Sequence, residues 1–62
     1  MDNQTLSFLT KLQQSNSPLA IYLTNGIKLR GHLLEFDQRC IVLGGQTTQL
    51  IYQHSISTIM AQ

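Results

Sequence analysis

The chain has 62 residues, of which 42% are hydrophobic and 11% charged, and its formal net charge is +1. A domain of this size buries only about 60% of the surface that its unfolded chain exposes, so its core alone is marginally stable. The single cysteine, Cys40, cannot form an intrachain disulfide, and no Cys/His cluster has the spacing of zinc ligands. We therefore expect one domain over residues 1–62 that is stabilised by self-association.

Most of the polar residues are uncharged: the sequence has eight glutamines and eleven serines and threonines. Four basic side chains are available for phosphate contacts, so binding to nucleic acid would need several copies of the chain or pockets that hold bases. No apolar run is long enough to span a membrane, and the N-terminus lacks the basic and apolar segments of a signal peptide. We expect a cytoplasmic protein with no membrane partner.

The N-terminal segment predicts a short amphipathic helix. Leucine recurs at every third position between residues 4 and 15, which places an apolar stripe on one helix face. Asp2 and Asn3 are candidate N-caps. Pro18 predicts the end of the helix, because the residue before a proline is pushed out of the helical region.

The rest of the chain predicts five short strands, at residues 19–24, 27–36, 40–43, 48–52 and 56–60. Asn25-Gly26 is typical of a hairpin turn in which both residues have positive φ. The alternation of the second strand slips at Leu33-Leu34, soon after Gly31, and this predicts a strong bend.

One helix and five antiparallel strands, one of them bent, predict an α+β, mostly β domain whose sheet curves into a small open barrel. The last two strands carry no lysine or proline that would protect an exposed sheet edge. Such edges can pair between copies, and the copies form a ring if the rotation closes. Composition and edge strands together predict a homo-oligomer.

Nothing in the sequence indicates catalysis. Cys40 lies in an apolar strand and is expected in the core, and Asp37 is expected to accept hydrogen bonds in a turn. Taken alone, His54 would be a structural histidine and Tyr22 a half-buried strand residue. We expect no enzymatic activity, no cofactor and no metal ion.

The chain contains the stretches IYLTNGIKLRG at residues 21–31, FDQ at 36–38 and IYQHSIST at 51–58. The first two stretches together, and the third by itself, resemble the two signature sequences of Hfq, the bacterial Sm-like RNA chaperone. The resemblance covers nearly the whole chain without gaps. It implies an Sm-like fold and a homohexameric ring. It also implies that single-stranded RNA, both mRNA and small regulatory RNA, binds the ring in post-transcriptional regulation and the stress response.

The resemblance implies a first RNA-binding site on the distal face of the ring, where A-rich or purine-rich RNA binds in pockets between subunits. The matching side chains suit this role. An aromatic ring and aliphatic groups can stack a base, an amide and a hydroxyl can read its edge, and cations can bind phosphates. The residues implied for this face are Tyr22, Gly26, Ile27, Lys28, Leu29, Arg30, Gln49 and Thr58.

A second site is implied on the proximal face, around the pore, where the family binds U-rich RNA. Its residues here are Gln38, Arg39, Gln53 and His54. Arg39 replaces the usual aromatic residue and Gln53 the usual lysine, and Thr5 replaces a helix glutamine. We expect these substitutions to weaken the binding of U-rich RNA. They need not abolish it, because an arginine plane can still stack on a base.

The rim of the ring departs furthest from the family. Gln13, Gln14 and Asn16 occupy the positions of arginines that help two RNA strands to anneal, so we expect weak annealing. We also expect no disordered tail of the kind that many relatives carry. The alternative function is a ring that has lost most RNA affinity and acts as a scaffold for protein partners.

Overall fold

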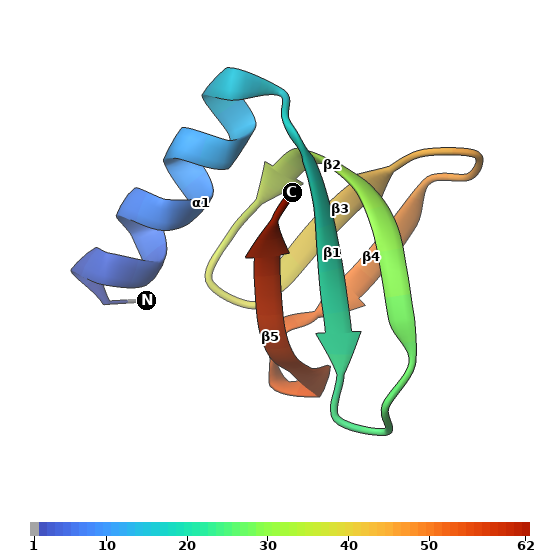
Figure 1. Cartoon of the computed structure of the whole chain (residues 1–62). Coiled ribbons are helices and arrows are strands. Elements are labelled where there is room, and N and C mark those ends of the chain that lie inside the picture. The colour runs from blue at the N-terminus through green and yellow to red at the C-terminus, as the bar shows by residue number, and fades with distance from the viewer. Residues whose placement is uncertain (1) are drawn as a thin grey trace.

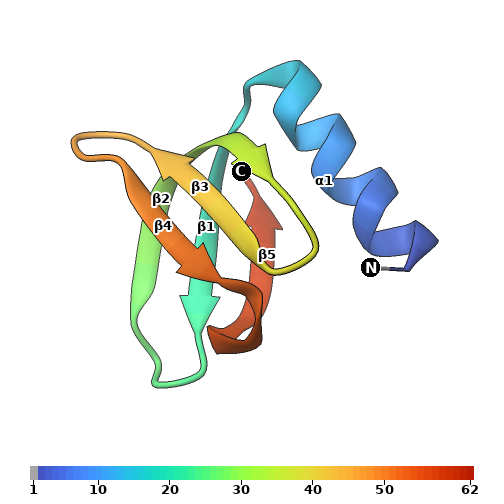
Figure 2. The same ribbon diagram turned by 180° about the vertical axis from the view of Figure 1, so that it is seen from behind.

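The computed structural model describes residues 2–62 and shows one helix beside a curved antiparallel sheet of five strands (Figures 1 and 2). The predicted elements are confirmed, and their bounds differ from the prediction by at most one residue at either end. The elements are α1 (Asn3–Ser15), β1 (Pro18–Leu23), β2 (Lys28–Phe36), β3 (Cys40–Gly44), β4 (Gln49–Tyr52), the 3₁₀ turn η1 (Gln53–Ser55) and β5 (Ile56–Ala61).

Both ends of α1 are capped by the residues around it. The Asp2 carboxylate accepts a hydrogen bond from the Thr5 backbone N–H at 2.7 Å, which satisfies one free donor of the first turn. That bond also lowers the pKa of Asp2. At the other end Asn16 is left-handed (φ 53°, ψ 32°), and its N–H donates to the Leu12 carbonyl at 3.1 Å. The helix is therefore fixed at both termini, before the chain turns into β1.

The turn between β1 and β2 differs from the prediction. Among residues 2–62 only Asn16 and Gly26 have positive φ, so Asn25 does not. The Leu23 N–H donates to the Ile27 carbonyl at 2.8 Å, and the Gly26 N–H donates to the Leu23 carbonyl at 2.9 Å. These bonds close a three-residue loop, in which a turn is followed by one left-handed glycine. Only the glycine needs positive φ in this type of loop.

The predicted bend of β2 is confirmed. The first part of β2 pairs with β1 and the last part with β3, and His32 pairs with both strands. Beyond it the register shifts between Leu33 and Glu35, which leaves Leu34 as an extra residue in a bulge. Gly31 permits the close approach, because a Cβ at this position would lie 2.1 Å from the Gly44 carbonyl oxygen.

The strands follow the order β4-β3-β2-β1-β5, so β4 and β5 are the two edges of the sheet. Cys40, expected in the core, is only half-buried in β3, next to the short edge strand β4. No helix within residues 2–62 combines the length and the apolar character needed to cross a membrane. The core lies between α1 and the concave sheet and consists of Leu9, Leu12, Leu19, Ile21, Leu33, Ile41, Leu43 and Ile51.

Candidate nucleic-acid interface

Tyr22 lies at the centre of a polar cluster that spans three neighbouring strands. In the register of the sheet it stands directly opposite Lys28 on β2 and Thr58 on β5. Directly opposed residues of antiparallel strands project from the same face, so the ring, the ammonium group and the hydroxyl share one surface. The Lys28 Nζ atom lies 5.4 Å from the centroid of the Tyr22 ring.

A bulge in β5 lies beside Tyr22. Tyr22 pairs with Thr58 but Leu23 pairs with Ile56, which leaves Ser57 as the extra residue. The Ser57 hydroxyl donates to the Tyr22 carbonyl at 3.3 Å. A bulge changes the direction of the side chains around it, and this one directly precedes Thr58, the residue that pairs with the tyrosine.

Three further residues implied for the distal face lie on or near β2. Arg30 is exposed and pairs with Ala20, so it projects from the same face as Lys28. Ile27 is 52% exposed next to the β1–β2 turn, which contains Gly26. Leu29 occupies the alternate face of β2 and packs against the core.

Gln49, the last residue implied for this face, lies far from the others in the sheet. It is an exposed residue of β4 and pairs with Leu43 of β3. Thr58 lies on β5, at the opposite edge. One chain therefore brings together Tyr22, Lys28, Arg30 and Thr58 but does not place Gln49 beside them.

The residues implied for the proximal face are brought together within one chain. Gln38 and Arg39, from the β2–β3 turn, line a shallow cleft with Gln53 and His54 of η1. The Gln53 side-chain amide donates to the Asp37 carbonyl. Its backbone N–H donates to the Arg39 carbonyl at 2.7 Å. Gln53 therefore joins the two segments that form the cleft, and its amide is engaged in that contact.

Asp37 holds the β2–β3 turn in shape. Its carboxylate accepts hydrogen bonds from the backbone N–H groups of Arg39 and Cys40, both at 2.8 Å. These two bonds, that of Arg39 first, lower the pKa of Asp37. The expectation that Asp37 is a turn acceptor is confirmed.

Tyr52 belongs to the same cleft and was missed by the sequence reasoning. It is 53% exposed, and its ring stacks on that of His54 with a centroid separation of 5.8 Å and an interplanar angle of 25°. An aromatic residue directly before the Gln53-His54 pair was the sequence signal that could have identified it.

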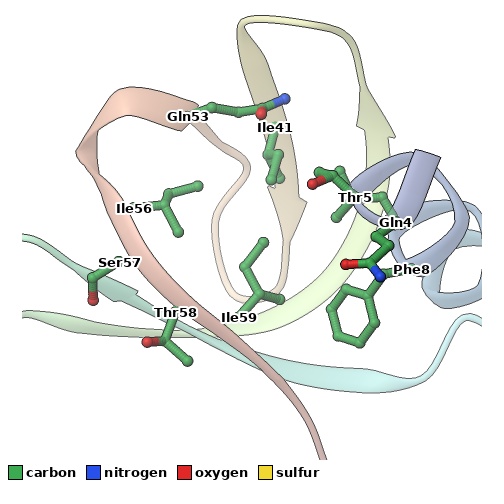
Figure 3. Close-up of a pocket in the computed structure, with 10 residues that line it drawn as sticks. Gln4, Thr5, Phe8, Ile41, Gln53, Ile56, Ser57, Thr58 and Ile59 are labelled. Atoms are coloured by element: carbon green, nitrogen blue, oxygen red, sulfur yellow. The ribbon is translucent and has the colours of Figure 1, made fainter. Parts of the chain in front are cut away.

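A larger cleft of about 500 Å³ lies between α1 and β5 (Figure 3). Ile41, Ile56 and Ile59 form its apolar interior, while Thr5 and Gln53 add polar groups. Two of the three positions at which the sequence departs from the family's proximal pattern, Thr5 and Gln53, thus lie in one cleft, while Arg39 lines the smaller one. Within residues 2–62 there is no group of three or more His, Cys, Asp or Glu side chains that could hold a metal ion.

The comparisons with known proteins agree with this geometry. The family model described as "Hfq protein" matches residues 4–62. A 1.55 Å crystal structure of the pleiotropic translational regulator Hfq is 27% identical, with a TM-score of 0.92 over 95% of this chain and 100% of that one. An Hfq protein from Anabaena sp. is 20% identical, with a TM-score of 0.92 over 98% of this chain and 100% of that one, which shows the fold alone. These matches confirm the predicted Sm-like fold.

Proposed function

Because the chain belongs to the Hfq family, whose members are RNA-binding chaperones that assemble into rings, we propose that it forms a homohexamer that binds A-rich or purine-rich single-stranded RNA. The observation that carries this proposal is the common face of Tyr22, Lys28 and Thr58. A base can stack on the tyrosine ring, the hydroxyl can bind its edge, and the ammonium group can bind a phosphate.

The position of Gln49 supports a binding pocket between two copies. Gln49 lies on β4 and Thr58 on β5, at opposite edges of the sheet. If β4 of one copy pairs with β5 of the next, both edges gain backbone partners, and Gln49 of one copy approaches Tyr22 and Thr58 of its neighbour. The same pairing would cover Leu50, which is 57% exposed on β4.

We infer weak binding of U-rich RNA at the proximal cleft. Where the family has a lysine, Gln53 supplies an amide that already donates to the Asp37 carbonyl. Where the family has an aromatic ring, Arg39 supplies a flexible side chain. The cleft therefore has fewer groups that can hold a uracil and its phosphate than the family pattern provides.

The rim is proposed to promote annealing poorly, for a related reason. The Gln13 side-chain amide donates to the Leu34 carbonyl at 2.8 Å, so it links α1 to β2. Gln14 and Asn16 carry no charge. Amides do not concentrate phosphate backbones as arginines do.

The proposed role is post-transcriptional regulation, including the stress response, through binding of mRNA and small regulatory RNA in the cytoplasm. The family is one of RNA-binding proteins and not of known enzymes. The side chains on the face that carries Tyr22 fit an RNA-binding protein, since they can hold a base and a phosphate and need no catalytic group to do so.

Fluorescence anisotropy with short A-rich and U-rich RNAs at fixed salt tests the proposal. The wild type and Tyr22→Phe should bind A-rich RNA, whereas Tyr22→Ala should lose roughly five- to a hundredfold in affinity, the usual value of one stacked base. Binding of neither RNA at micromolar concentration would favour the scaffold function. Tighter binding of U-rich than of A-rich RNA would contradict the assignment of the two faces.

A further inference from the structure

One face of β2 carries a row of three basic side chains, a lysine, an arginine and a histidine. Lys28, Arg30 and His32 occupy alternate positions of the strand and pair with Tyr22, Ala20 and Pro18 of β1 in turn. Alternate residues of a strand project from the same face, about 6.8 Å apart. The row therefore starts beside the Tyr22 ring and runs along β2.

The far end of the row opens into a groove. Arg30 and His32 line it together with Asn16, the C-terminal cap of α1. Arg30 is exposed and His32 half-buried, and both residues line this groove. Asn16 is one of the uncharged rim positions, and the row thus connects the tyrosine face with the end of α1.

The three acidic side chains of the chain lie elsewhere, although Gln62, the last residue of the sequence, also lines the groove. Asp2 caps the start of α1, and Asp37 accepts two backbone hydrogen bonds in the β2–β3 turn. Glu35 follows the bulge of β2, in a separate depression with Cys40. The row on β2 therefore keeps its hydrogen-bond donors for a ligand, and the ligand it suits is an anion.

We propose that Lys28, Arg30 and His32 form a phosphate track, along which the RNA backbone runs from the Tyr22 platform toward the C-terminal end of α1. The inference rests on the proposed function, because it places RNA on the tyrosine face. Successive phosphates of an extended single strand are separated by a distance similar to that between alternate residues of a strand. Ammonium, guanidinium and imidazole N–H groups all donate to phosphate oxygens.

The track predicts that nucleotides flanking the A-rich core increase affinity whatever their bases. The core binds through Tyr22, whereas the flank binds through its phosphates at Arg30 and His32. Phosphate contacts of a single strand each steepen the dependence of log Kd on log salt by about 0.7. The gain from the flank should therefore disappear at high salt, while the affinity for the core changes less.

The test compares an A-rich core alone with the same core extended by cytidines at its 5′ or its 3′ end. Both RNAs are titrated by anisotropy at several salt concentrations, against the wild type, Arg30→Gln, His32→Glu and His32→Lys. For each substitution that weakens the track, the gain from the flank should fall roughly two- to fivefold. His32→Glu should change the affinity for the core little, whereas Arg30→Gln can also weaken it, because Arg30 is one of the residues implied for the distal face. His32→Lys should increase the gain.

Lys11→Gln is the matched control, because it also removes one positive charge, from the exposed surface of α1. It should leave the gain from the flank unchanged. Melting curves check that each variant folds; if His32→Glu does not, Arg30→Gln at its exposed position carries the test. A flank that adds no affinity to the wild type, or equal gains in all variants, would overturn the track. Failure of the wild type to bind the core would instead overturn the proposed function, and the track with it.

Discussion

The ammonium nitrogen of Lys28 lies 5.4 Å from the centroid of the Tyr22 ring, within the range of a cation–π contact. The two residues face each other across β1 and β2. In the proposed binding mode, a base that stacks on the same face of the ring would displace the ammonium group and leave it free to bind a phosphate. The proposal therefore predicts that base and phosphate recognition at this face are coupled through one pair of residues.

Lys28→Gln should separate these two contributions. Because it removes a cation and leaves the ring, it should weaken binding of A-rich RNA at low salt and reduce the slope of log Kd against log salt by about 0.7 for each phosphate that the side chain binds in the wild type. Tyr22→Ala should weaken binding at every salt concentration, because stacking does not depend on counterions. Anisotropy titrations over a series of salt concentrations measure both effects. An unchanged slope for Lys28→Gln would show that this side chain does not contact phosphate.

Gly31→Ala should destabilise the fold strongly. The added Cβ would lie 2.1 Å from the Gly44 carbonyl oxygen, a backbone atom that cannot move without disturbing β3. We expect a loss of at least about 1–3 kcal/mol in the free energy of unfolding, measured by urea denaturation. Gly45→Ala is the control, because its Cβ would lie 3.4 Å from the nearest atom, the Arg30 carbonyl oxygen. Equal stability of the two variants would rule out the steric explanation.

The local pattern of the sequence predicts the elements well, and the reasons are physical. Alternation of polar and apolar residues defines each strand, and the slip at Leu33-Leu34 locates the bulge of β2. The turn at Asn25-Gly26 is a different matter, since loops of two and of three residues both accept Asn-Gly. Which one forms depends on how β1 and β2 pair, and the turn residues alone do not determine that pairing.

The candidate site depends on contacts that are distant in sequence. Tyr22 meets Thr58 only because β5 returns to pair with β1. The hydrogen bond from the Gln53 amide to the Asp37 carbonyl joins two turns. The alternation of polar and apolar residues does not predict such a bond. The family resemblance predicts Thr58 and Gln53 as site residues, whereas the position of His32 beside Arg30 follows from the register of β2.

Acid should destabilise the fold partly through Asp37. Its folded-state pKa is lowered from the ordinary value of 3.8 by the N–H groups of Arg39 and Cys40. A lowered pKa contributes stability that is present above the unfolded pKa and is lost as the pH falls through the folded one. Asp37→Asn should therefore show a smaller loss of melting temperature between about pH 5 and pH 2 than the wild type. Parallel pH profiles of the two proteins would contradict this role, and Asp2→Asn tests the helix cap in the same way.

Leu50→Lys should weaken the assembly. Leu50 is 57% exposed on the edge strand β4, where pairing with β5 of another copy would cover it. A lysine there would lose hydration in the interface, and lysine is a residue that protects natural sheet edges from pairing. Native mass spectrometry should show a hexamer for the wild type and smaller species for the variant. A stable, folded wild-type monomer would refute the ring, and Lys11→Gln serves as a control on the exposed helix surface.

Arg39→Tyr combined with Gln53→Lys should strengthen binding of U-rich RNA. The tyrosine adds a ring on which a uracil can stack, in a turn whose backbone Asp37 already fixes. The lysine adds a cation and keeps a donor for the Asp37 carbonyl, which the Gln53 amide binds in the wild type. One added stacking contact corresponds to roughly a five- to hundredfold gain, measured by anisotropy with U-rich RNA. Binding of A-rich RNA should not change, because Tyr22 lies outside this cleft. A gain that is equal for both RNAs would indicate general attraction to phosphate, and Arg39→Ala separates the loss of the guanidinium group from the gain of the ring.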